Sequence, residues 1–60
     1  MIKTYIEMFK DIEKMKRKGK EKSAVECLKM MLHFDGSFVE STAQDYGSRY
    51  IKRTIKEILK

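Results

Sequence analysis

Few side chains in this 60-residue sequence have the types and spacing needed for catalysis or metal binding. His33 is the single histidine, Cys27 is the single cysteine, and they lie six positions apart. If both belong to one helix, this spacing puts them on different faces, so they do not form a nucleophile–base pair. A metal site would also need a third ligand. We therefore predict no catalytic residue, no metal site and no cofactor, and we expect a binding protein rather than an enzyme.

Basic residues form the other chemically distinctive group. The segment 14–22, KMKRKGKEK, carries six basic residues and one acidic residue, whereas the rest of the chain has eight of each, so the whole net charge of +5 lies in this segment. Such clusters bind phosphates or acidic protein surfaces, and they also serve as solvated faces that keep a small protein soluble. The candidate residues for binding a protein partner or nucleic acid are Lys16, Arg17, Lys18, Lys20, Lys22, Arg49, Lys52, Arg53 and Lys56.

The elements that carry these residues are predicted to be helices. Apolar residues recur at intervals of three and four along most of the chain, which indicates an all-α subunit. The three predicted helices span about 2–17, 24–34 and 41–59. The basic segment 14–22 is the predicted linker between the first two helices, with Gly19 at the helix end. Ser23 and Glu26 form a capping box that would start the second helix.

The segment 32–39, LHFDGSFV, leaves two interpretations open. Asp35 and Gly36 between short apolar runs are typical of a tight hairpin turn, but Gly36 also suits the end of a helix. We prefer a helix end followed by a loop, and keep a short β-hairpin at Asp35-Gly36 as the minor alternative. Phe34 and Phe38 are too apolar to stay exposed, so we expect them in the core or in a contact between subunits.

The last third of the chain divides into an apolar and a basic side when it is wound as a helix. Its segment TAQDYGSRYIKRTIKEIL resembles the second half of a helix-turn-helix, in which Ala43 and Gly47 would stand four apart as in that family. The position six residues after the glycine, which is apolar in that family, is Arg53 here. We therefore predict one continuous helix from Ser41, in which Gly47 allows another backbone to approach closely.

The size of the chain suggests self-association. Residues 1–60 form one small domain, and a core of this size is marginal without a disulfide, a metal or a second subunit. A single cysteine excludes an internal disulfide, so we expect a homodimeric helical bundle. The candidate core or dimer contacts are Tyr5, Met8, Phe9, Ile12, Phe34, Phe38, Tyr50, Ile51, Ile55 and Ile58.

Composition sets the expected class of action. Charged residues make up 38% of the chain and apolar residues 42%, with no signal-peptide pattern and no apolar run near the length of a membrane span, so we expect a soluble cytoplasmic protein of a host or bacterial cell and no membrane partner. The leading hypothesis is a small phage or mobile-element protein that occludes or remodels a larger protein partner. The alternative is a dimeric DNA-binding transcriptional regulator that uses the basic linker and the basic face of the last helix.

Overall fold

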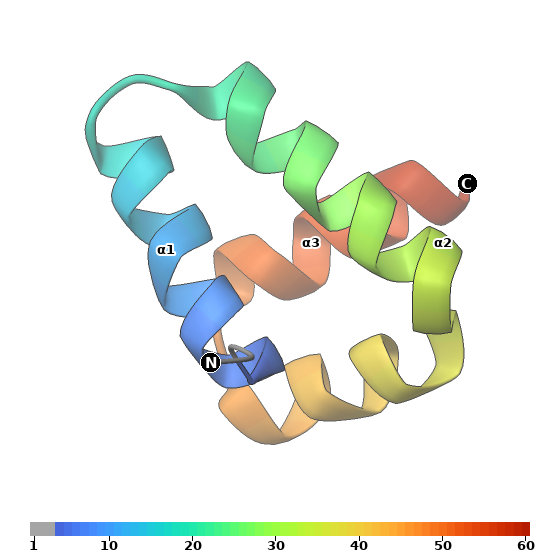
Figure 1. Ribbon diagram of the computed structural model, residues 1–60. Coiled ribbons are helices and arrows are strands. Elements are labelled where there is room, and N and C mark those ends of the chain that lie inside the picture. The colour runs from blue at the N-terminus through green and yellow to red at the C-terminus, as the bar shows by residue number, and fades with distance from the viewer. Residues whose placement is uncertain (1–3) are drawn as a thin grey trace.

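Three α-helices make up residues 4–60, the part of the chain that the computed structural model describes. They are α1 (Tyr5–Arg17), α2 (Glu21–Tyr46) and α3 (Arg49–Leu59). α1 and the two halves of α2 form three sides of a ring, and α3 runs across the back of that ring (Figure 1). The predicted all-α subunit of three helices is therefore confirmed. Within residues 4–60, no helix is both long and apolar enough to cross a membrane.

α1 begins and ends at local signals. Thr4 has an extended backbone, and its Oγ1 accepts a hydrogen bond of 3.2 Å from the Glu7 amide, so Thr4 is the N-cap. The helix thus begins at Tyr5 rather than at residue 2; residues 2 and 3 lie outside the described part of the chain. At the other end the Lys20 amide donates to the Met15 carbonyl at 2.8 Å, across Gly19 with a φ of 79°. This arrangement closes α1 at Arg17, as predicted.

The connection to α2 is shorter than the predicted linker over 14–22. Because the chain reverses at Gly19, only residues 18–20 separate the two helices, and α2 begins at Glu21. The predicted capping box of Ser23 and Glu26 is therefore wrong, since Ser23 lies inside the helix. Glu21 in the first turn stabilises this helix start through the helix dipole.

α2 is bent at Asp35, whose φ of −158° and ψ of 63° are non-helical. The bend lies where the second helix was predicted to end, because aspartate and glycine are both weak helix formers. Helix is present on both sides of it, however, where the sequence had suggested a loop or a hairpin. The second half of α2, residues 36–46, is helical because Val39 and Ala43 stand four apart and bury their side chains in the same core. The predicted helix start at Ser41 is wrong for this reason.

The continuous helix predicted over 41–59 is also wrong, because the chain turns at Gly47 and Ser48. Gly47 has a φ of 79°, and its amide donates to the Ala43 carbonyl at 3.1 Å, which ends α2. The Ser48 hydroxyl then accepts a hydrogen bond of 3.3 Å from the Ile51 amide and caps α3. A Cβ at Gly47 would meet nothing within 4 Å. The positive φ therefore explains the glycine, and the predicted close approach of another backbone does not.

Two glycine substitutions are expected to shift the midpoint of thermal unfolding, Tm, in opposite directions. Gly47→Ala forces alanine into the left-handed region, at a cost of about 1–2 kcal/mol. Gly36 is helical and an added Cβ meets nothing within 4 Å, so Gly36→Ala should gain about 0.5–1 kcal/mol. Circular dichroism at 222 nm measures Tm, which moves by about 4–8 °C per kcal/mol in a domain of this size. Shifts of the same sign in both variants would contradict the assigned backbone.

All three helices contribute to one core. Its buried members are Phe9, Ile12, Ala24, Leu28, Met31, Val39, Ala43, Ile51 and Ile55. Of the predicted core or dimer contacts, four are buried, namely Phe9, Ile12, Ile51 and Ile55, and four are half-buried against the core, namely Tyr5, Met8, Tyr50 and Ile58. Phe34 and Phe38 differ, because the single chain leaves 75% and 57% of them exposed.

Candidate functional site

α3 carries an exposed strip of positive charge. Its Ile51 and Ile55 are buried in the core, whereas Arg49, Arg53 and Lys56 are exposed. Arg49 and Arg53 stand four residues apart and so lie one helical turn from each other on the same side. The helix has four basic residues and a single acidic one, Glu57. We call the four basic residues the basic strip: Arg49, Lys52, Arg53 and Lys56.

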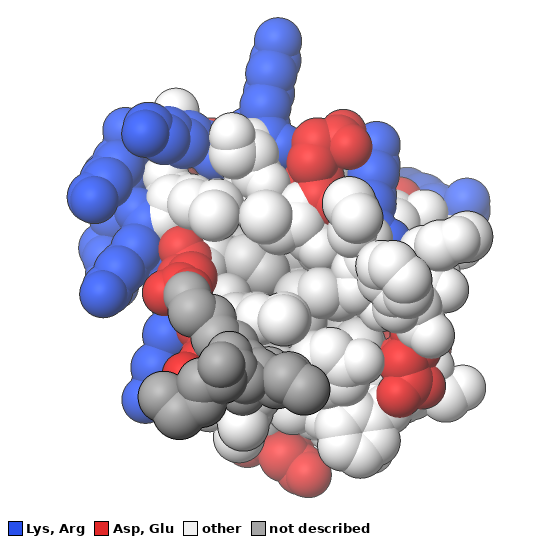
Figure 2. All heavy atoms as spheres, in the orientation of Figure 1, with Lys and Arg blue, Asp and Glu red and all other residues white. Residues whose placement is uncertain are grey.

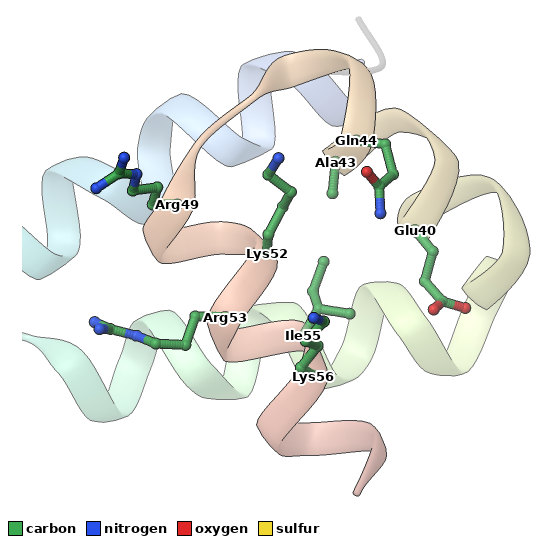
Figure 3. A pocket seen from close by; sticks show the side chains of 8 residues that line it. All are labelled: Glu40, Ala43, Gln44, Arg49, Lys52, Arg53, Ile55 and Lys56. Atoms are coloured by element: carbon green, nitrogen blue, oxygen red, sulfur yellow. The ribbon is translucent and has the colours of Figure 1, made fainter.

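A hollow of about 520 Å³ lies beside the basic strip, between α3 and the second half of α2. Ala43 and Ile55 supply its apolar lining, and Glu40 lies on the α2 side. Figure 3 shows Arg49 and Arg53 extending to the same side of α3, away from Glu40. Lys52 instead extends across the hollow toward α2. The two arginines are therefore accessible to a large ligand, whereas Lys52 is half-buried.

The basic end of α1 lies against the first turn of α3. The Lys16 Nζ is 4.6 Å from the centre of the Tyr50 ring, a cation–π contact. Tyr50 directly follows Arg49, so Lys16 adds to the positive charge at the beginning of α3. The other predicted binding residues of segment 14–22 are exposed, namely Arg17, Lys18, Lys20 and Lys22. Figure 2 shows basic side chains gathered around the connection between α1 and α2.

One carboxylate of α1 fixes the turn that precedes α3. The Tyr46 hydroxyl donates to Glu13 Oε1 at 2.6 Å, and the Ser48 hydroxyl donates to Glu13 Oε2 at 3.1 Å. The hydrogen bond to Glu13 and, secondarily, burial raise the pKa of Tyr46 above its ordinary value of 10.0. Glu13 thus joins the end of α2 and the cap of α3 to α1. The sequence did not reveal this role, because Glu13 and Tyr46 are 33 residues apart and no local pattern links them.

The two residues first considered for catalysis lie apart from the basic strip. Cys27 is half-buried beside α1, and His33 is exposed with its ring 5.9 Å from the Phe34 ring. Among residues 4–60, no group of three or more histidine, cysteine, aspartate or glutamate side chains is arranged to hold a metal ion.

Together these features define a small all-α chain whose last two helical segments are joined by a two-residue turn and whose last helix is basic on its outer side. Comparison with known proteins finds no matching family model, no matching curated protein and no matching solved structure. Function is therefore inferred from the side chains themselves.

Proposed function

We propose that this protein binds duplex DNA by placing α3 in the major groove. The observation that supports this most is the exposed pair Arg49 and Arg53 of the basic strip, which extend to the same side of a helix anchored in the core through Ile51 and Ile55. The major groove of B-DNA is about 12 Å wide and admits an α-helix. Arg49 and Arg53 are in the first two turns of α3, the part of a recognition helix that contacts base edges in helix-turn-helix proteins.

The helices around α3 support the same proposal. The second half of α2, the turn at Gly47 and Ser48, and α3 are two helices joined by a short turn, which is the order of elements in helix-turn-helix proteins, whose second helix enters the groove. The hydrogen bonds of Glu13 hold this unit against α1. Lys16, at the basic end of α1, is close to the first turn of α3, where it is suited to contact the DNA backbone.

We also propose that the protein acts as a homodimer inside the cell, where its target is found. The single chain leaves Phe34 and Phe38 largely exposed, and a chain of 60 residues gains stability from a second subunit. Two copies would also double the number of basic strips that can contact DNA.

Fluorescence anisotropy with a labelled duplex of about two helical turns tests DNA binding. We expect a Kd of about 10⁻⁴ to 10⁻⁶ M at physiological salt. The affinity should fall steeply as the salt concentration rises. Arg49→Glu and Arg53→Glu should each weaken binding by about tenfold or more, because each loses a phosphate or base contact and adds repulsion.

Lys29→Glu is the matched control for this experiment. Lys29 is an exposed residue of α2 that pairs with Glu26 at 3.6 Å and does not line the hollow beside the basic strip. This control changes the net charge by the same amount as the arginine substitutions do. If DNA contacts the basic strip itself, the Kd of Lys29→Glu should stay within about threefold of the wild-type Kd. The proposal is wrong if the duplex is not bound even at low salt, or if Lys29→Glu weakens binding as much as Arg53→Glu does.

A second candidate function is the occlusion or remodelling of a larger protein that has an acidic face. The hollow beside α3 favours it, because an apolar lining from Ala43 and Ile55 within a basic rim suits a protein side chain better than a phosphate. This candidate predicts a one-to-one complex with a single host protein that is lost when Arg49, Arg53 and Lys56 are changed to glutamate. Such a complex, combined with no binding of duplex DNA, would favour it over the first proposal.

A further inference from the structure

An apolar groove of about 860 Å³ runs between α1 and the first half of α2. α3 runs behind α1 and the first half of α2 (Figure 1), and no residue of α3 lines the groove, so the groove and α3 lie on opposite faces of the molecule. Met8 and Met15 of α1 line the groove, together with Met30, Met31 and Phe34 of α2. Figure 2 shows a hollowed central area of uncharged side chains on this face, with both basic and acidic side chains around it. The face therefore offers hydrophobic contact to a partner and little charge.

The edge of the groove carries several exposed apolar side chains. Phe34 is 75% exposed, Met30 59% and Phe38 57%, and these are three of the five large apolar side chains that are exposed within residues 4–60. The Phe38 ring rests on Tyr5, with 5.4 Å between ring centres, whereas the contact of Phe34 is with the exposed His33 ring. Isolated exposed apolar residues are normal, but several around one groove indicate an interaction surface.

We infer that this groove is the contact between two copies of the chain. A two-fold symmetric interface requires a surface that is complementary to itself, in which a residue of each copy meets a different residue of the other. The groove face meets this requirement, because it combines a projecting ring, Phe34, with a hollow lined by methionines. Flexible methionine side chains adapt their shape to an inserted aromatic ring and contact it favourably.

Charge favours a second copy over other partners. Each chain carries a net charge of +5, so two copies repel each other unless they meet through a face that lacks lysine and arginine. Among residues 4–60, no lysine or arginine lines the groove, and the one charged residue of that lining is Asp11. An acidic partner would find no complementary charge among these lining residues and a basic partner only Asp11, whereas a second copy meets an equally apolar surface. The two copies would also enlarge a core that is small for a stable domain.

Sedimentation equilibrium without DNA tests the interface, from about 1 μM to 1 mM protein. We expect a monomer–dimer equilibrium in this range. Phe34→Asp should raise the dissociation constant of the dimer by about 100-fold or more, since it places a charge in an apolar contact. Leu59→Asp is the matched control, because Leu59 is a 53% exposed apolar residue on α3 and does not line the groove. The dissociation constant of the Leu59→Asp dimer should stay within about threefold of the wild-type value.

Two further readouts keep the test decisive. Circular dichroism confirms that each variant is folded, and Phe34→Ala replaces Phe34→Asp if the charged variant does not fold. Cys27 is half-buried in the groove lining, so its reaction with a thiol reagent should slow as wild-type protein concentration rises. A folded wild-type monomer at about 1 mM overturns the inference, as does a dimer that Leu59→Asp disrupts and Phe34 substitutions do not. Because DNA is absent, these outcomes are independent of whether the protein binds DNA.

Discussion

Replacing Phe9 with alanine is expected to leave the chain unfolded at 25 °C. Phe9 is fully buried, and its ring lies 5.5 Å from the Tyr46 ring, between centres. Removing a buried phenylalanine side chain costs about 3–5 kcal/mol, from lost burial and from the cavity left behind. A chain of this size rarely has more than about 3–5 kcal/mol of stability in total. The helical signal at 222 nm, and its loss on heating, measure the outcome.

Leu59→Ala is the control for the loss of an apolar side chain. Leu59 is 53% exposed, so the change should cost no more than about 0.5 kcal/mol and leave the helical signal intact. If the Tm of Phe9→Ala were instead within a few degrees of the wild-type Tm, Phe9 would not be the centre of the core. Both variants should be compared at equal protein concentration, because self-association raises apparent stability.

Replacing Glu13 with alanine is expected to lower the free energy of unfolding by about 2–4 kcal/mol. Its two carboxylate oxygens accept hydrogen bonds from Tyr46 and Ser48, and bonds to a charged group contribute about 1.5–3 kcal/mol each, less where they are partly exposed. The loss should be concentrated at the turn before α3. Hydrogen exchange should therefore accelerate most at the amides of the first turn of α3, such as Ile51, whose amide bonds to Ser48.

Glu13→Gln separates hydrogen bonding from charge. Glutamine keeps an acceptor for Tyr46 but has no charge, so it should cost less than alanine. The pKa of Tyr46 should fall toward its ordinary value in both variants, because the bond to the Glu13 carboxylate is the main cause of the raised pKa. NMR titration of the tyrosine ring carbons measures this shift. An unchanged pKa in Glu13→Ala would contradict the Glu13–Tyr46 hydrogen bond.

The raised pKa also gives the stability a dependence on alkaline pH. The folded chain holds the Tyr46 proton more tightly than the unfolded chain does, whose tyrosine has the ordinary pKa of 10.0. The stabilisation is therefore complete below pH 10 and is lost as pH rises through the higher pKa of the folded state.

The sequence predicted what depends on local periodicity. The apolar intervals of three and four correctly indicated three helices, and Gly19 correctly marked the end of α1. The break near residue 34 was also predicted, from Asp35 and Gly36. In each case the signal lies within one or two helical turns of the feature that it predicts, and burial agrees with it.

The errors arose where one residue type serves two roles. Gly47 lies on the apolar side of a continuous helical pattern, and periodicity cannot distinguish a glycine inside such a helix from one that ends it in the left-handed conformation. Val39 and Ala43 are buried on the same side of one helix. The Asp35-Gly36 pair just before Val39 nevertheless suggested a loop in this segment. The hydrogen bonds of Glu13 depend on contacts across 33 and 35 residues, so only the folded arrangement reveals them.

The placement of the groove and α3 on opposite faces has a geometric consequence. The molecule measures 32 × 27 × 20 Å, so whatever fills the groove leaves the outer side of α3 unobstructed. A pair joined through the groove points its two copies of α3 away from each other. Regulators of palindromic operators instead align both recognition helices along one side of a duplex. If both proposals hold, this pair would tie together two separate stretches of DNA.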